Sequence, residues 1–376
     1  MNNIRSRKLE HINIVLNEDV QSKEATLLEY VRLIHDPIPN LDFNEVDLHK
    51  DFCGFTLDAP LIITGMTGGH EEALKINRAI SKIAGKFNIG FGVGSQRAGI
   101  EERSLAYTFK IAREMAPNAF IIANLGAVQL NKGYTLKEVE AAVEMIKANA
   151  IAIHLNPGQE VYQNEGDTDF SNLVAKVEEI VDRLSVPVII KEVGNGLNKE
   201  LVSQLAAIGV RCFDTAGLGG TSWIKVEGIR GKGTKGSKDP GKISDYWGNP
   251  TAMSIVETRV ASPQAYIIGS GGIRDGLDAA RAISIGADVS GIAFPVLKAL
   301  DKGGEEGLES FIDNFIYQLK SLIFLVGGKD VYSLWRKPVI IWGRLREEML
   351  SRGIGIDEYL NRRIYTLIWR RKLYGA

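Results

Sequence analysis

The sequence has little cysteine and no excess of charge of either sign. Only Cys53 and Cys212 occur among 376 residues, too few for a disulfide framework or a cysteine-based metal site. The formal net charge is −1, so the chain has no overall attraction to nucleic acid or to a membrane surface. These two deficits favour a cytoplasmic globular protein with no nucleic-acid partner.

Long hydrophobic runs are missing as well. One of the longest, Leu322–Val326, is far shorter than the roughly 20 apolar residues that a membrane-spanning helix needs. The first eleven residues are polar and do not resemble a signal peptide. No membrane partner is therefore expected, although 45% hydrophobic residues are enough for a large core.

Short β-branched apolar runs recur along the chain, with amphipathic stretches such as Leu136–Ala148 and Asn172–Leu184 between some of them. This alternation is typical of parallel strands joined by crossover helices. The eight runs are Leu61–Ile63, Ile89–Val93, Phe120–Ala123, Ile151–His154, Val186–Lys191, Val210–Asp214, Ala265–Gly269 and Asp288–Ala293. Eight units predict an α/β fold of the (β/α)8 TIM-barrel type, with a doubly wound open sheet as the alternative.

Two additions flank the predicted barrel, which we place at residues 60–300. Residues 1–59 form an N-terminal extension, with a predicted helix over Ser22–Ile34 and a hairpin around Gly54. Residues 301–376 have helical periodicity and a basic end at residues 369–372, and we expect them to complete the barrel and to form subunit contacts.

Residues 224–248 form an unusual stretch between the sixth and seventh strands. Five glycines and six Lys or Arg residues lie between positions 225 and 242, a composition that predicts no packed core. The stretch is therefore either a disordered insertion or a mobile lid over an anionic ligand.

The last two strands end in glycine-rich turns. The seventh is followed by Gly271 and Gly272, and the eighth ends in the sequence GIAFP. In (β/α)8 enzymes these two loops commonly hold a phosphate through backbone N–H groups. The pattern favours a phosphate site, although tight turn geometry is the simpler alternative.

Small and hydroxyl residues also follow the first and sixth strands, which suits a flat ring such as flavin lying across the mouth. Lys191 ends an apolar strand and would point into that mouth, where an unpaired ammonium is costly. The flavin N1–C2=O edge would partner it, and pairing with Glu192 is the alternative.

A second group of polar residues suggests another anion site on the same face. Arg97 and His154 follow two strands, and Arg7 and Lys8 stand near the start of the chain. Together they predict a cationic pocket for a diphosphate-like group, with an Arg97–Glu101 ion pair as the alternative.

These residues together resemble the type 2 isopentenyl diphosphate isomerases, flavoenzymes of the FMN-binding (β/α)8 group. The matching stretches run in order from residue 7 to about residue 295, and little matches beyond residue 300. They are Arg7-Lys8 with His11, Met66-Thr67-Gly68-Gly69, Gly94-Ser95-Gln96-Arg97, Asn124-Leu125-Gly126, His154-Leu155-Asn156 with Gln159-Glu160, Lys191-Glu192-Val193-Gly194, Gly219-Gly220-Thr221-Ser222-Trp223 and Gly271-Gly272-Ile273-Arg274.

The resemblance implies roles for individual residues. It implies FMN contacts by Met66, Thr67, Gly68, Ser95, Asn124, Lys191, Thr221, Gly271, Gly272, Arg274, Ala293 and Phe294. It implies substrate contacts by Arg7, Lys8, His11, Ser95, Arg97, His154, Asn156 and Gln159. Gln159 and His154 would be catalytic, and Glu160 would bind the Mg²⁺ that bridges to the diphosphate.

The implied reaction converts isopentenyl diphosphate into dimethylallyl diphosphate by a 1,3-proton shift without net oxidation. Neither Cys53 nor Cys212 stands where it could act as an acid in the mouth, so reduced FMN is expected to be the acid and base. NADPH would then serve only to reduce the flavin. A homo-oligomer, a tetramer or larger, is expected.

Three rival classes remain open at this point. A 2-hydroxyacid oxidase of the same barrel group would need a late histidine base, but no histidine follows His154. An inosine-monophosphate-dehydrogenase-like enzyme would need a cysteine in a mouth loop. A non-catalytic flavin- or phosphate-binding barrel would keep the glycine turns without needing the cationic pocket.

Overall fold

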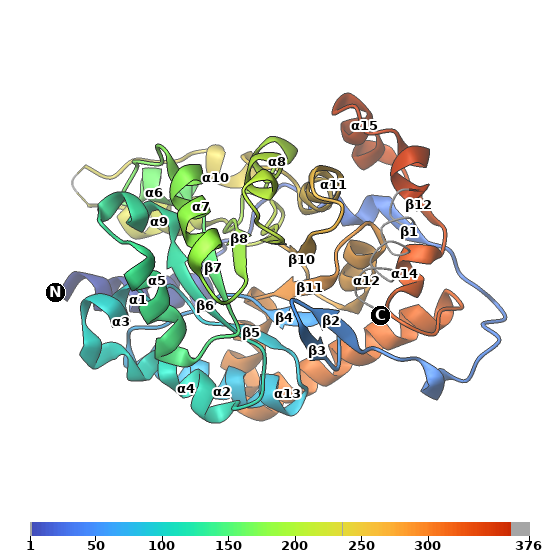
Figure 1. Ribbon diagram of the computed structural model, residues 1–376, viewed down its shortest axis with the longest axis horizontal. Helices are drawn as coiled ribbons and strands as arrows, with labels where there is room; N and C mark the ends of the chain where they lie inside the picture. Colours follow the sequence, from blue (N-terminus) through green and yellow to red (C-terminus); the bar gives the residue numbers. More distant parts are fainter. Residues whose placement is uncertain (1, 235, 362–376) are drawn as a thin grey trace.

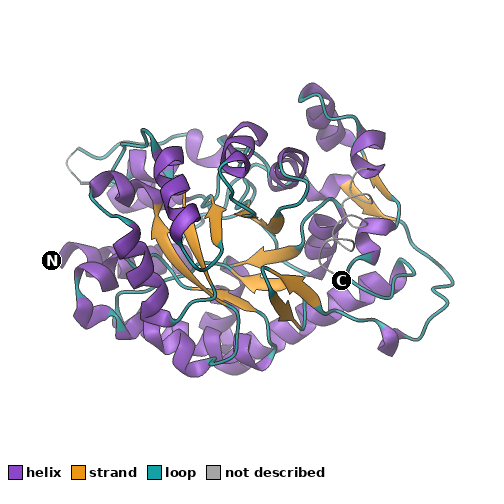
Figure 2. Cartoon of the chain, viewed as in Figure 1, coloured by secondary structure: helices purple, strands orange, loops and turns teal. Residues whose placement is uncertain are grey.

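Eight parallel strands close into a barrel at the centre of the computed structural model (Figures 1 and 2), which describes residues 2–234 and 236–361. In chain order they are β4 (Leu61–Ile63), β5 (Gly90–Gly92), β6 (Ile121–Gly126), β7 (Ala150–His154), β8 (Val188–Lys191), β9 (Cys212–Asp214), β10 (Tyr266–Ser270) and β11 (Val289–Ile292). All eight predicted strands are confirmed, and the open-sheet alternative is excluded.

The barrel closes by pairing its last strand with its first. Gly291 of β11 lies opposite Ile62 of β4, in parallel register like every other pair around the ring. Because all the strands run the same way, their carboxyl ends meet at one mouth and their amino ends at the opposite floor.

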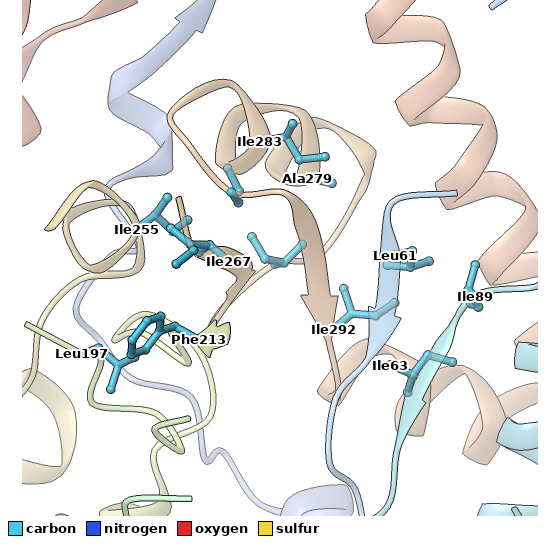
Figure 3. Packing of buried hydrophobic residues seen from close by; sticks show 14 of the residues in the cluster. Leu61, Ile63, Ile89, Leu197, Phe213, Ile255, Ile267, Ala279, Ile283 and Ile292 are labelled. Carbon is cyan, nitrogen blue, oxygen red and sulfur yellow. The ribbon is translucent and has the colours of Figure 1, made fainter. Parts of the chain in front are cut away.

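Helices form the outer layer around the strands. They are α2 (Glu71–Lys86), α4 (Tyr107–Met115), α5 (Leu136–Ile146), α7 (Leu173–Arg183), α8 (Lys199–Ala207), α11 (Thr251–Ala261), α12 (Gly276–Ser284) and α13 (Phe294–Leu325). The two helices predicted within residues 136–148 and 172–184 are confirmed as α5 and α7. Figure 3 shows Ile267 of β10 beside Ile255 of α11, and Ala279 and Ile283 of α12 belong to the same buried cluster.

Short elements lie on the loops that follow the strands. They are α3 (Arg97–Glu101), η3 (Arg103–Leu105), η4 (Ala127–Lys132), α6 (Pro157–Tyr162), α9 (Trp223–Gly231) and α10 (Ile243–Tyr246). Each begins within nine residues of a strand end or follows another such element. They therefore carry the side chains that surround the mouth.

The N-terminal extension differs from the prediction. It contains α1 (Asn2–Asn17), η1 (Leu28–Tyr30), β1 (Val31–Leu33) and η2 (Phe43–Glu45). The helix predicted over residues 22–34 is wrong. Val31 of β1 instead pairs with Ile341 of β12 (Val339–Ile341), in an antiparallel ribbon. This partner lies about 300 residues away, so local periodicity carried no sign of it.

The hairpin predicted around Gly54 is confirmed. Its strands are β2 (Lys50–Phe52) and β3 (Phe55–Leu57), and Cys53 and Gly54 form the turn. Phe52 and Leu57 are fully buried against residues of the barrel interior, including Phe120. The hairpin thereby closes the floor of the barrel.

The stretch at residues 224–248 is only partly as predicted. Its first part is the helix α9, in which Val226 is fully buried against Val15 and Leu297. The prediction that no part of the stretch packs into a core is wrong, because α1 and α13 supply the apolar partners. Ser222 caps α9 by accepting the N–H of Lys225.

The C-terminal segment packs tightly on the barrel. Helix α13 crosses position 300, bends at Gly304 and leads to α14 (Ser333–Arg336), β12 and α15 (Gly343–Ser351). The Trp335 ring is buried, and its Nε1 donates to Ala287 O over 3.0 Å. The basic end at residues 369–372 lies outside the described residues. Among the described residues, no helix is long and apolar enough to cross a membrane.

We predict that Trp335→Ala lowers the free energy of unfolding by about 3–5 kcal/mol, because it removes a fully buried ring from the contact between the C-terminal segment and the barrel. Trp342→Ala is the matched control, since this ring is 44% exposed, and its cost should be near 1 kcal/mol or less. Urea denaturation followed by circular dichroism measures both. A loss for Trp335→Ala as small as that for Trp342→Ala would contradict a stabilising contact between the Trp335 ring and the barrel.

Candidate active site

A cavity of about 240 Å³ lies at the carboxyl ends of the barrel strands. All eight strand ends or the loops directly after them line it. The contributing residues include Thr64, Gly94, Asn124, His154, Lys191, Ala216, Ser270 and Ile292. The chemistry-bearing loops of the sequence therefore converge on one site.

The structure brings nearly all of the predicted site residues to this cavity. Its lining contains Arg7, Lys8, His11, Met66, Thr67, Ser95, Arg97, Asn124, His154, Asn156, Gln159, Glu160, Lys191, Thr221, Gly271, Gly272, Arg274, Ala293 and Phe294. Gly68 is outside the lining, and a Cβ added to it would lie 1.8 Å from the Phe109 ring. Gly68 is thus required for packing, and its predicted contact with FMN has no support in the cavity lining.

Helix α1 forms one wall of the cavity. It packs against α9 and α13 and turns Lys8, His11 and Ile12 toward the cavity. The His11 ring meets Trp223 of α9 edge-on, with 5.1 Å between ring centroids. The N-terminal residues that were predicted to bind substrate therefore reach the mouth on a helix.

Glu227 of α9 is the centre of a hydrogen-bond network that the sequence analysis missed. Its carboxylate is 2.9 Å from His11 Nε2 and accepts from Gln159 Nε2 over 2.9 Å and from Arg230 Nε over 2.7 Å. Burial alone would raise its pKa, but these donors and the Arg230 charge lower the pKa to about 2. One feature of the sequence could have indicated Glu227 as a site residue. It stands four positions after Trp223 on a helix capped by Ser222, so the two side chains share one helix face.

The cavity holds positive charge that the protein leaves poorly compensated. Burial, together with the neighbouring Arg7 charge, lowers the pKa of Lys8 to about 8. Burial and the charges of Lys191 and Lys8 lower the pKa of His154 to about 3. An anion bound here would stabilise the charged forms of Lys8 and His154, as expected for a diphosphate site.

His154 is neutral at physiological pH, and its hydrogen bond selects one tautomer. Asn124 donates from Nδ2 to Val93 O, so its Oδ1 faces His154 Nδ1 at 2.8 Å and accepts from it. The ring then carries its proton on Nδ1. Nε2 is left as a hydrogen-bond acceptor at the cavity.

The loop after β7 arranges three polar side chains around the start of α6. Pro157 occupies the first turn, where its missing N–H costs no hydrogen bond. Asn156 Nδ2 donates to Glu160 Oε1 over 2.8 Å and to Gln159 Oε1 over 3.2 Å. Burial raises the pKa of Glu160, although the N–H of Asp167 and the Asn156 amide oppose this effect.

Glu160 stands alone as a candidate metal ligand. Within residues 2–234 and 236–361, no three His, Cys, Asp or Glu side chains group together as a metal site. Mg²⁺ is often bound through one or two carboxylates together with substrate phosphate and water. A Mg²⁺ ion at Glu160 would therefore depend on oxygen atoms from a bound phosphate.

The glycine turn after β10 fits the phosphate of FMN. A Cβ on Gly271 would lie 2.2 Å from Gly217 O, and one on Gly272 would lie 2.4 Å from Gly219 O. Both glycines have positive φ, 105° and 71°. Without side chains at these positions, the backbone N–H groups of the turn can approach a ligand closely. Such N–H groups beside the first turn of α13 suit a phosphate.

Lys191 lies at the bottom of the cavity and is only 8% exposed. Its Nζ donates to the backbone oxygen of Glu192 over 2.6 Å and is 3.9 Å from Asp214 Oδ2. The Glu192 carboxylate instead accepts the N–H groups of the following loop, such as that of Gly194. The ammonium is therefore available at the cavity for an acceptor such as a flavin ring edge.

Arg97 lies where it can take both roles that the sequence left open, an ion pair with Glu101 and a contact with an anion in the cavity. Its Nε donates to Glu101 over 2.7 Å, and its Nη1 is 3.6 Å from Asp167. It also lines the cavity and is therefore within reach of an anion bound there. The surface ion pair and the cavity position are both present.

Comparison with known proteins shows which class of enzyme has this barrel fold. Residues 98–341 match the family described as FMN-dependent dehydrogenase. Solved structures of a mandelate oxidase (TM-score 0.62, 16% identity) and of a putative lactate oxidase from Pediococcus acidilactici (TM-score 0.64, 14% identity) share the fold. The alignments cover 88% and 91% of this chain and 95% and 94% of those chains. The fold is that of the FMN-dependent barrel enzymes.

Closer relatives define the family within this class. Isopentenyl-diphosphate delta-isomerase of Aeropyrum pernix is 53% identical over 97% of this chain and 98% of its own length. The enzymes of the same name from Metallosphaera sedula and Pyrococcus horikoshii are 45% and 42% identical, over 94% and 95% of this chain and 97% of each relative. The chain belongs to the isopentenyl-diphosphate delta-isomerase family.

We predict that Glu227→Gln destabilises the protein by about 3 kcal/mol near pH 7, the value of a pKa lowered from 4.5 to about 2. The unfolded carboxyl titrates near its ordinary pKa, so this contribution is complete above pH 4.5. It should be lost as the pH falls toward 2. Urea denaturation at pH 7 and pH 3 measures the difference between wild type and variant at each pH.

Glu10→Gln is the control for this network. Glu10 also contacts Arg230, at 3.5 Å, but its side chain is 49% exposed. Its loss should cost less than about 1 kcal/mol because exposed ion pairs are screened by water. A Glu227→Gln effect as small as that of Glu10→Gln would contradict the assigned network.

Proposed function

We propose that the protein interconverts isopentenyl diphosphate and dimethylallyl diphosphate, using reduced FMN and Mg²⁺. One observation carries this proposal. The cationic residues expected to bind a diphosphate, Arg7, Lys8 and Arg97, line the same cavity as the glycine turn expected to bind the FMN phosphate. The names of relatives at 42–53% identity support it.

The diphosphate is held by the cationic side of the cavity. Arg7 and Lys8 of α1 and Arg97 of α3 supply charge-assisted donors, and Asn156 adds an amide. Ser95 and His11 complete this set. A bound diphosphate would oppose the burial and the cationic charges that lower the pKa of His154, and the protonated ring would donate from Nε2 to a phosphate oxygen.

FMN would lie across the barrel mouth, with its phosphate at Gly271, Gly272 and the start of α13. Lys191 would meet the polar edge of the ring, with Met66, Thr67, Asn124 and Thr221 around it. When bound in its reduced form, FMN would supply the acid and base of the 1,3-proton shift.

The side chains of the protein position the substrate for this shift. Gln159 is held by Glu227 through its Nε2, which fixes the carboxamide beside the cavity. His154 is held by Asn124 with its proton on Nδ1. Apolar residues of α1 and Trp223 keep water away from the alkene.

Glu160 would bind a Mg²⁺ ion that bridges to the diphosphate. Without the cation, this buried carboxylate would repel the substrate. NADPH is proposed as the reductant that prepares the flavin, and it is not consumed in each turnover. We also propose a homo-oligomer, a tetramer or larger, and the exposed Leu350 suits a subunit contact.

An FMN-dependent oxidoreductase of the 2-hydroxyacid oxidase type is the second candidate. The fold similarity to mandelate and lactate oxidases favours it. A general-base histidine late in the barrel is missing, because all five histidines lie at or before position 154. The isomerase is therefore the better-supported function.

We predict that the FMN-loaded protein isomerises isopentenyl diphosphate only after the flavin is reduced. Dithionite should replace NADPH, since only the reduced state is needed and no hydride is consumed. Product formation is measured anaerobically, with FMN, Mg²⁺ and reductant each omitted in turn. Equal turnover by the oxidised form or by the apoprotein would contradict the proposed function.

We predict that Glu160→Gln raises the Mg²⁺ concentration needed for half-maximal activity by about 10- to 100-fold, because one charged ligand is lost. Gln159→Ala should lower kcat with little change in the Mg²⁺ requirement. Val161→Ala, on the exposed side of the same helix, is the control and should leave both unchanged. A wild-type Mg²⁺ titration curve for Glu160→Gln would assign the metal to other groups.

A further inference from the structure

The only two cysteines of the sequence meet at the floor of the barrel. Cys53 is at the tip of the β2–β3 hairpin, and Cys212 is the first residue of β9. They are 159 positions apart in the chain, but their Sγ atoms lie 2.7 Å apart. This is closer than van der Waals contact between two sulfur atoms, and it leaves no room for another group between them.

The backbone at Cys53 adds an independent observation. The hairpin turn has two residues, Cys53 and Gly54, with φ of 50° and 80°. Positive φ at both central positions is typical of a type I′ turn, in which the first position favours Asn, Asp or Gly. Cysteine is disfavoured in this conformation, so local turn preference does not explain why it stands here.

The rest of the hairpin holds Cys53 against its partner. The Phe52 ring packs edge-on against Phe120 and Tyr266, with centroid distances of 5.8 and 5.4 Å. β9 lies three strands around the barrel from β4, which follows the hairpin. A bond between the sulfur atoms would therefore link segments that do not pair as strands.

We propose that Cys53 and Cys212 are a modification site at which an intramolecular disulfide forms when the protein meets a small-molecule disulfide oxidant. The Cys53 thiolate is partly exposed and attacks the oxidant, forming a mixed disulfide and releasing one thiol. The Cys212 thiolate then attacks Cys53 Sγ, which forms the protein disulfide and releases the second thiol. The oxidant gains the two electrons that the cysteines lose.

The bond would act on stability and leave the cavity unchanged. It would close a loop of about 160 residues and so constrain the unfolded chain strongly. Cys212 begins β9 at the floor, whereas the candidate active site lies at the carboxyl ends of the strands. Oxidation should therefore raise thermal stability without changing ligand affinity at the mouth.

The test uses the full chain, first reduced and then incubated with oxidised glutathione. Thiols are counted in denaturant, the intact mass is measured, and linked peptides are mapped after digestion without reductant. We expect two titratable thiols before oxidation and none afterwards, with no glutathione mass retained. The midpoint of thermal inactivation should rise by about 5 °C or more, and this gain should disappear on adding reductant.

Cys53→Asn separates the effect of the bond from that of turn strain. Asn tolerates positive φ, so this variant should be at least as stable as reduced wild type but less stable than the oxidised protein. Its stability should not respond to oxidant. Two thiols that stay titratable in oxidised wild type, or a glutathione adduct that persists on Cys53, would overturn the proposal. So would an equal gain from oxidation in Cys53→Asn.

Discussion

Closure of eight parallel strands into a ring is the constraint on which the site depends. Because the last strand pairs with the first in parallel register, every loop that follows a strand opens at the same mouth. Residues as distant as Lys8, His154 and Phe294 therefore line one cavity. The N-terminal extension closes the barrel at both ends. Helix α1 covers the mouth, and the β2–β3 hairpin fills the floor.

The balance of charge within the mouth then determines what can bind. Buried cations such as Lys8 are held below their ordinary pKa, which makes the cavity favourable for an anion. Glu227 is kept ionised by its donors and fixes His11, Gln159 and Arg230. The Glu227 carboxylate thus fixes the side chains on the basic side of the site. On the other side, the glycine turn after β10 could offer neutral N–H groups to a second anion.

The sequence alone predicted the barrel because each strand is a short apolar run whose own residues carry the signal. It also predicted most of the cavity lining, since residues such as Asn124 and His154 directly follow or end those runs. It failed where structure depends on distant partners. β1 forms only because Val31 meets Ile341, and α9 packs only because α1 lies beside Val226. Glu227 was missed for this reason, and the contact between Cys53 and Cys212 has no local signature at all.

The central claim is that the flavin and the diphosphate occupy one shared cavity under α1. The most direct measurement is the absorption spectrum of the FMN-loaded protein during titration with isopentenyl diphosphate. The account predicts a saturable change in the flavin bands, because the substrate would lie against the ring in a site closed to water. Substrate binding detected by calorimetry, with a flavin spectrum that does not change, would contradict the shared cavity.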